Sequence, residues 1–207
     1  MAGRRAVAGA GPTGRRPKRS IPADDEQLFS DARRFLASHA LESLAKVQPR
    51  AVRECTDAIL TANQVFTYGV GRSGLVAQAC AVRLVQLGLK AHFIGDIATP
   101  VVKDGDVGII ISNVGQTMSA VQTANIMRRV GAKVVVLTAN LTSKLAQTAN
   151  VTIHLPVASE SKQRSLAPLG TVFEDCAMIL LDALVPVLMS RLGETEESMR
   201  ARHAIWV

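Results

Sequence analysis

The 207-residue chain has few aromatic side chains and few cysteines. Aromatic residues make up 3% of it, which argues against the stacking surfaces that recognise single-stranded nucleic acids. Its three cysteines (Cys55, Cys80 and Cys176) are odd in number and widely spaced, with no CxxC motif that would suggest a zinc site. They are typical of buried free thiols in a reducing compartment, so we expect a cytoplasmic protein that needs no metal.

The chain also lacks an apolar run of the roughly 18 residues that a transmembrane helix needs. The segment 177–189 comes nearest, but Asp182 and Pro186 interrupt it. It therefore predicts a core helix, and no membrane partner is expected.

Acidic residues are absent from residues 1–20, which contain six of the chain's 24 lysines and arginines. The net charge of +7 thus comes mainly from this segment, because the remainder holds 18 basic and 17 acidic residues. We expect a disordered basic tail over 1–22 and a nearly neutral single domain over 23–207. The charge gives no support for a nucleic-acid partner.

Apolar periodicity divides the domain into three parts. Residues 24–61 predict an N-terminal helical hairpin, with helices over 24–47 and 51–61 separated by Pro49. Residues 64–155 alternate between strands and helices, and residues 169–207 predict C-terminal helices that include a long one over 171–191. The expected strands are 65–68, 91–94, 107–111, 134–137 and 151–155, and the helices between them are 75–87, 118–130 and 143–149. This order predicts an α/β fold, a doubly wound three-layer sandwich with a five-stranded parallel sheet.

Two glycine-containing loops follow apolar strands. The first is Gly69-Val70-Gly71-Arg72-Ser73-Gly74, and the second is Ser112-Asn113-Val114-Gly115-Gln116-Thr117. Such a turn at a helix start presents free backbone N–H groups, which suit an anion such as phosphate. Because the carboxyl ends of parallel strands lie at one edge of a sheet, the two loops predict one phosphate site with two walls.

The first loop also matches the dinucleotide fingerprint G-x-G-x-x-G, and Asp96 stands 22 residues after Gly74, where a ribose-binding acid is expected. A nicotinamide-dependent enzyme is therefore a less favoured alternative. The charge of Arg72, the hydroxyl of Ser73 and the second loop all count against it.

Residues 64–155 resemble a sugar isomerase (SIS) domain, and residues 24–207 resemble 6-phospho-3-hexuloisomerases. The matching stretches are 69–74, Thr99-Pro100, 112–117, 168–174 and Arg202-His203-Ala204. The resemblance implies isomerisation of a 3-keto hexulose 6-phosphate to fructose 6-phosphate through an enediol, without a cofactor. It also implies that Ser73 and the loop residues Ser112, Asn113, Val114, Gly115, Gln116 and Thr117 hold the sugar phosphate.

The same resemblance assigns proton abstraction to Glu174 and an active-site role to His203, in its own or a neighbouring subunit. A carboxylate is a competent base when partial burial raises its pKa, although the nearby helix N-terminus favours its charged form. Ser73 and Thr117 have the alternative role of helix caps. The helix 171–191 is apolar nearly all round, which predicts a homodimer or homotetramer.

The second loop departs from the Ser-Gly-Ser-Gly-Glu-Thr pattern typical of the resembled family. Asn113 replaces glycine, Val114 replaces serine and Gln116 replaces glutamate. Two further functions therefore stay open: another aldose–ketose phosphate isomerase, and a sugar-phosphate-binding protein without turnover.

Overall fold

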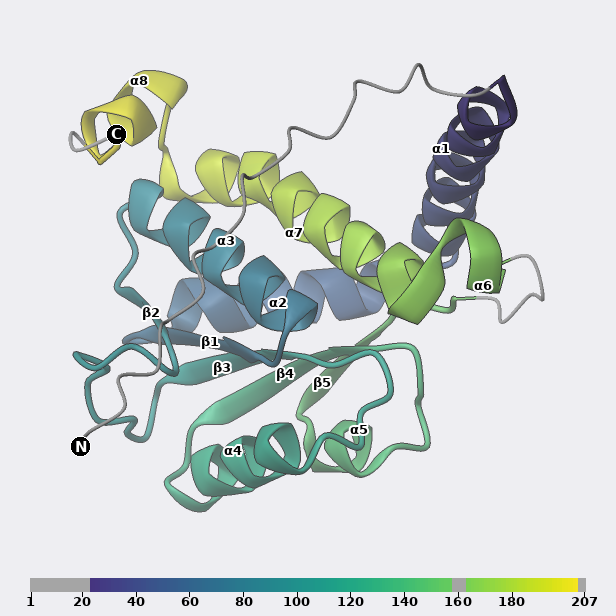
Figure 1. The fold of residues 1–207 in the computed structure, drawn as a ribbon. Helices are drawn as coiled ribbons and strands as arrows, with labels where there is room; N and C mark the ends of the chain where they lie inside the picture. Colours follow the sequence, from purple (N-terminus) through teal and green to yellow (C-terminus); the bar gives the residue numbers. More distant parts are fainter. Residues whose placement is uncertain (1–22, 158–162, 205–207) are drawn as a thin grey trace, which may run out of the picture.

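The computed structural model describes residues 23–157 and 163–204, so the predicted tail over 1–22 lies outside the described residues. At its centre is a five-stranded sheet of order β2-β1-β3-β4-β5 in which every strand pair is parallel (Figure 1). The strands are β1 (Val65–Gly69), β2 (Ala91–Phe93), β3 (Val107–Ile111), β4 (Lys133–Thr138) and β5 (Val151–His154). The predicted doubly wound parallel sheet is confirmed.

Helices cover both faces of this sheet (Figure 1). On one face lie α2 (Pro49–Thr61), α3 (Arg72–Gln86) and α7 (Thr171–Leu192), and on the other lie α4 (Met118–Arg129) and α5 (Lys144–Thr148). Successive β3 side chains alternate between the two layers: Ile109 and Ile111 join the larger apolar cluster, and Ile110 joins the smaller one. Both layers are thus anchored on the same central strand.

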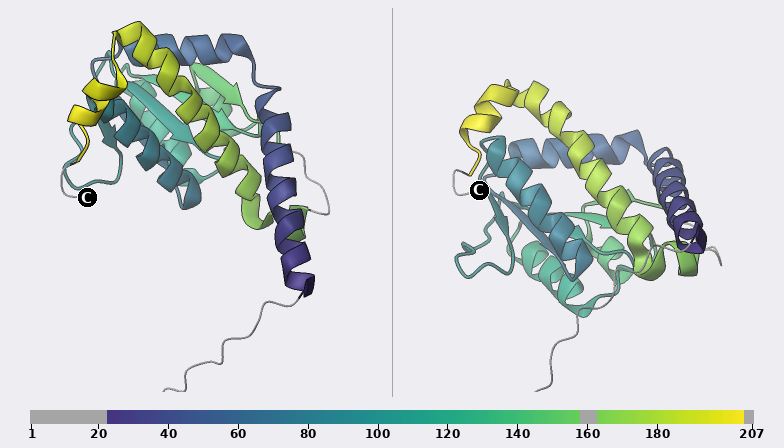
Figure 2. Two further views of the ribbon diagram at one scale, coloured as in Figure 1. Left: turned by 90° about the horizontal axis from the view of Figure 1, so that it is seen from above. Right: turned by 45° about the horizontal axis from the view of Figure 1, so that its top comes forward.

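The N-terminal helices are more open than a hairpin. α1 (Ala23–Leu44) turns away from α2, and each of them packs against α7 instead (Figure 2). Pro49 was expected to lie between the two helices, but it is the first residue of α2. Its missing N–H costs nothing there, because the first N–H groups of a helix have no partner within the helix.

The C-terminal part contains α6 (Gln163–Leu166), the 3-10 turn η1 (Pro168–Gly170), α7 and α8 (Glu196–Ala201). Glycines in the left-handed region flank α7, with φ of 84° at Gly170 and 69° at Gly193. The short α6 was not expected from the sequence. Along residues 23–157 and 163–204, no helix combines the length and apolarity needed to cross a bilayer.

The strand order reverses at β1. After β1 the chain adds β2 on one side and then returns to place β3 on the other. In open α/β sheets, ligands bind outside the carboxyl ends of the strands at such a switch point. The first glycine-containing loop follows β1 and the second follows β3, so the fold places the two loops together at this position.

Candidate active site

Close packing explains the glycines of the first loop. A Cβ at Gly69 would lie 2.5 Å from the carbonyl oxygen of Ser73, and a Cβ at Gly74 would lie 2.8 Å from the carbonyl oxygen of Gly69. Gly71, at the start of α3, has a φ of 60°. The strand order also differs from that of the dinucleotide-binding fold. There the first strand lies between the second and the fourth, whereas here β1 lies between β2 and β3. The fingerprint spacing therefore follows from a tight strand–turn–helix unit.

The second loop is braced from inside. The Ser112 hydroxyl accepts a hydrogen bond from the Gly115 N–H at 3.2 Å, and the Thr138 hydroxyl donates to the Asn113 carbonyl at 3.0 Å. Gly115 has a φ of 63°, and a Cβ on it would lie 2.2 Å from the hydroxyl oxygen of Ser143. A side chain at this position would disrupt the loop, so Gly115 has a structural reason beside its predicted ligand role.

A small cavity of about 110 Å³ lies between the two loops. Its lining consists of Val70, Ser73, Ile111, Ser112, Asn113, Val114, Thr117 and Ala120. Five of the predicted substrate contacts thus surround one space, whereas Gly115 is buried behind it and Gln116 is exposed beside it. The volume suits a phosphate-sized group and is well below the roughly 300 Å³ at which pockets for larger ligands begin.

Two helices begin at this cavity without side-chain caps. Gly71 precedes α3 and Thr117 precedes α4, and neither position makes a side-chain cap hydrogen bond. Ser73 does not cap α3, as the alternative role required, because it lies within the helix and its hydroxyl is used elsewhere. Uncapped N-termini carry partial positive charge, which makes the cavity favourable for an anion.

Glu174 lies beside the cavity in the first turn of α7. Glu174 is 7% exposed, and the Ser73 hydroxyl donates a hydrogen bond to its Oε1 at 3.1 Å. Its Oε2 is buried and has no hydrogen-bond partner among the described residues. Burial raises the pKa of this carboxyl, while the Ser73 hydrogen bond and the Arg72 charge oppose the rise. Such a group is suited to accepting a proton.

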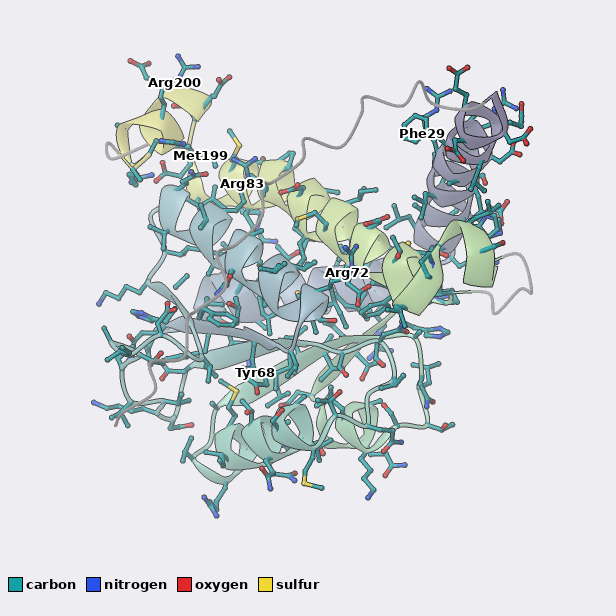
Figure 3. The ribbon with its side chains drawn as sticks, viewed as in Figure 1. Phe29, Tyr68, Arg72, Arg83, Met199 and Arg200 are labelled. Atoms are coloured by element: carbon teal, nitrogen blue, oxygen red, sulfur yellow. The ribbon has the colours of Figure 1, made fainter. Side chains whose placement is uncertain are left out.

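Arg72 links the first loop to α7. Its Nε lies 3.6 Å from Glu174 Oε2, and its Nη2 lies 3.5 Å from Asp175 Oδ1. Figure 3 shows Arg72 beside the first turns of α7. This pairing with acidic neighbours was one of the interpretations that the sequence left open for Arg72, but the sequence did not indicate Glu174 as the partner.

Gly170 is a site residue that sequence reasoning missed. A Cβ there would lie 2.7 Å from Asn113 Nδ2 and 3.7 Å from Glu174 Oε2. The absent side chain therefore allows the Asn113 amide to approach the start of α7 closely, near the carboxylate. A glycine just before a helix that starts with an apolar turn was the available signal, although it does not reveal which groups meet there.

His203 lies at the opposite end of the helical layer. Its neighbour Arg202 donates to the carbonyl of Gln86, the last residue of α3, whereas Ser73 lies in that helix's first turn. The 15 residues of α3 span about 22 Å at 1.5 Å per residue. The structure does not bring His203 to the Glu174 of the same chain, and its catalytic role stays a prediction.

Within the described residues, no group of three or more histidine, cysteine, aspartate or glutamate side chains could hold a metal ion. The three cysteines are free and buried, as predicted. The cavity residues are hydroxyls, amides, apolar groups and backbone N–H groups, which fit an anionic ligand.

Fold and cavity together define an α/β protein with a small cavity, suited to an anion, at the switch point of its sheet. The SIS domain family model matches residues 58–184, more than half of the chain, and the protein belongs to this family. The predicted family resemblance is thereby confirmed.

Several relatives carry a specific name. A Bacillus subtilis protein named 3-hexulose-6-phosphate isomerase is 34% identical over 78% of this chain and 90% of its own length. A Methanocaldococcus jannaschii protein of the same name is 33% identical over 71% of this chain and 79% of its own. Among solved structures, a Methanococcus jannaschii protein described as implying that same function has a TM-score of 0.73 and 27% identity, covering 89% of this chain and 99% of its own.

Proposed function

We propose that this protein is a sugar-phosphate isomerase that interconverts 3-hexulose 6-phosphate and fructose 6-phosphate through an enediol. The observation that carries the proposal is a buried carboxylate beside a cavity that suits an anion, with one oxygen hydrogen-bonded to Ser73 and the other without a hydrogen bond. The names of the Bacillus subtilis and Methanocaldococcus jannaschii relatives support the choice of substrate.

The phosphate occupies the cavity between the loops. Ser73 and Thr117, which line the cavity, stand at the starts of α3 and α4, where the first N–H groups have no partner within the helix and can bind the phosphate. Binding the phosphate at this fixed point positions the sugar carbons relative to Glu174, and such positioning lowers the entropic cost of reaction.

Glu174 then moves the proton. In fructose 6-phosphate it removes the hydrogen on C3, which leaves an enediol between C2 and C3, and it returns the proton to C2. The Ser73 hydrogen bond holds Oε1, so Oε2 is the oxygen that accepts the proton. General base catalysis of this kind contributes about 10²–10⁴-fold to a rate.

A role for His203 requires a second copy of the chain, because its own Glu174 lies at the other end of α3. α7 supports assembly: Ile179 and Val187 are 48% and 44% exposed beside a cavity of about 540 Å³ between α2 and α7. We therefore keep a homodimer or homotetramer as part of the proposal. A cytoplasmic location belongs to it as well, and the free buried thiols agree with a reducing compartment.

The test is to incubate the protein with fructose 6-phosphate in D2O and to follow deuterium at C3 by NMR. We expect incorporation by the wild type and a loss of about 10²–10⁴-fold in Glu174→Gln. Glu42→Gln, an exposed substitution on α1, is the matched control and should exchange normally. Normal exchange by Glu174→Gln would contradict the proposal, and saturable NADH binding would revive the dinucleotide alternative.

Val114 favours one second candidate, a sugar-phosphate sensor without turnover. It lines the cavity where the resembled family has a serine hydroxyl, and it is 56% exposed. Saturable binding of fructose 6-phosphate with no C3 exchange would establish this alternative. If the missing hydroxyl matters, Val114→Ser should tighten phosphate binding by about 2–10-fold, the value of one hydrogen bond. An unchanged phosphate affinity would show that the position makes no contact.

A further inference from the structure

Asn113 stands between the anion cavity and the Glu174 carboxylate. It lines the cavity, and its Nδ2 lies 2.7 Å from the position that a Cβ on Gly170 would take. Glu174 Oε2 lies 3.7 Å from that same position. The amide nitrogen and the carboxylate oxygen therefore both lie within 4 Å of one point beside Gly170.

The backbone holds this arrangement in place. The Asn113 carbonyl accepts hydrogen bonds from the Thr138 hydroxyl and from the Ala139 N–H, both at 3.0 Å. On the other side, Gly170 has a φ of 84° directly before α7. A residue with a side chain would be strained in this conformation and would press on the Asn113 amide. The loop and the helix start are thus held close together.

Glu174 Oε2 is an unusual group to leave in such a position. It is buried and has no hydrogen-bond partner among the described residues, although Oε1 is held by Ser73. Leaving a buried polar atom without a partner costs free energy, and such atoms point to a ligand or a catalytic role. Arg72 Nε lies 3.6 Å from Oε2 as an ion-pair partner but makes no hydrogen bond to it. A donor group and an acceptor without a hydrogen bond, both near Gly170, suit a ligand that engages both.

We propose that Asn113 is a catalytic residue, whose side-chain amide donates a hydrogen bond to the sugar oxygen that becomes negatively charged when Glu174 removes the neighbouring proton. This assignment rests on the proposed isomerase function. It gives Asn113 a role distinct from phosphate binding, which the loop shares among several residues.

In the reaction of fructose 6-phosphate, negative charge moves from Glu174 to the sugar. The C3–H bond breaks, its proton passes to Glu174 Oε2, and its electron pair forms the C2–C3 double bond while the carbonyl oxygen O2 takes the negative charge. Return of the proton to C2, with transfer of the O3 proton to O2, gives the 3-keto sugar. A neutral amide stabilises the O2 anion, and one such donor is worth about 10²–10³-fold in kcat.

The first arm of the test compares Asn113→Ala with Asn125→Ala in the deuterium-exchange assay. Asn125 is an exposed asparagine on α4, away from the cavity lining, and its substitution should leave the rate unchanged. Asn113→Ala should lower kcat about 10²-fold, with KM for fructose 6-phosphate within about threefold of the wild type. A kcat within about threefold of the wild type would overturn the assignment.

The second arm uses Asn113→Asp, which preserves the shape of the side chain and replaces the donor by a carboxylate. The charged group that already faces Glu174 is Arg72 on α3, which also pairs with Asp175 on α7. A further negative charge near Oε2 disfavours the Glu174 carboxylate, so the low-pH limb of the exchange profile should move to higher pH. A profile with its limb at the wild-type position would show that residue 113 does not face the base. This readout remains valid even if Asn113→Ala is poorly folded.

The two proposals fail in different ways. Exchange by the wild type with unchanged exchange by Asn113→Ala removes the role of Asn113 alone. Absence of exchange by the wild type removes the isomerase function and with it the role of Asn113.

Discussion

The two ends of α7 each carry a glutamate paired with a serine and an arginine, yet their carboxyl groups are held in opposite ways. At the N-terminal end, burial raises the pKa of Glu174 despite its partners. Just beyond the C-terminal end, the hydrogen bond from Arg202 lowers the pKa of Glu194. The same three residue types therefore accompany a raised pKa at one end and a lowered pKa at the other.

Burial of Glu174 and the arginine contacts of Glu194 together explain the difference. Arg202 donates from Nη1 and Nη2 to the two Glu194 oxygens at 2.7 and 3.0 Å, and Ser198 also donates to that carboxylate. Arg72 approaches only one Glu174 oxygen, at 3.6 Å. Two-point arginine contacts favour the charged form strongly. A carboxylate with hydrogen bonds to both oxygens ties α8 to the loop before it, whereas Glu174 has a hydrogen bond at only one oxygen and a longer ion pair at the other.

The largest effect on the rate should come from shortening the side chains of Glu174 and Glu194 by one methylene. Glu174→Asp withdraws the carboxylate from the cavity, and isomerisation should fall about 10²-fold because a displacement of about 1 Å has that cost. Glu194→Asp should leave the rate within about twofold. Steady-state kinetics with fructose 6-phosphate decide this, and equal losses in both variants would contradict the contrast between the two ends.

Removing the serines should have a smaller effect on the rate. Ser73→Ala takes away the donor to Oε1, so exchange at neutral pH should fall about tenfold or more, as expected for a hydrogen bond to a charged group. Ser198→Ala removes the capping box of α8 and should lower the melting temperature by about 2–4 °C without slowing exchange. Slower exchange in the Ser198 variant would show that the two ends are coupled.

Substitutions of the two arginines should have different effects on the pH dependence of exchange. Arg72 favours the charged form of Glu174, so Arg72→Gln should move the low-pH limb of exchange to higher pH and slow the reaction mainly in acid. Arg202→Gln should leave the limb where it is. Rates measured across the acidic range test this, and a limb that Arg72→Gln leaves in place would mean that the 3.6 Å contact carries no electrostatic effect.

Thermal stability should show the smallest effect, with opposite signs at the two ends. A raised pKa means that Glu174 destabilises the folded state above that pKa, and this penalty disappears as the pH falls through it toward the ordinary value. Glu174→Gln should therefore have a higher melting temperature than the wild type at neutral pH, and the difference should disappear in acid.

Because the pKa of Glu194 is lowered, this carboxylate stabilises the folded state at pH values above the ordinary pKa of glutamate. That stabilisation is lost as the pH falls through the lowered pKa. Glu194→Gln should melt lower at neutral pH, and equal signs in both melting series would contradict the account.

The sheet could be predicted well from sequence because its strands are short, apolar and separated by helical periodicity. Val107–Ile111 was placed correctly to the residue, and no end of the other strands differs by more than one residue. Pro49 was misplaced because proline fits the first turn of a helix as well as a break between helices. The opening of α1 away from α2 depends on packing against α7, and local sequence does not encode this contact (Figure 2).

The candidate site was predicted in composition but not in geometry. The sequence indicated Ser73 and Glu174 separately, and their 3.1 Å hydrogen bond joins residues that are 101 positions apart. The close approach of Asn113 to Gly170 depends equally on distant segments. His203 shows the converse limit, because a motif that resembles the family's lies far from the site within one chain.

The central claim is that Glu174 is the base that moves the carbon-bound proton, and the pH dependence of C3 deuterium exchange tests it most directly. The account predicts that wild-type exchange with fructose 6-phosphate falls as the pH decreases through a pKa above the ordinary value of glutamate, and that Glu174→Gln lacks this limb together with most of the rate. Exchange that persists in Glu174→Gln with the same pH profile would contradict it.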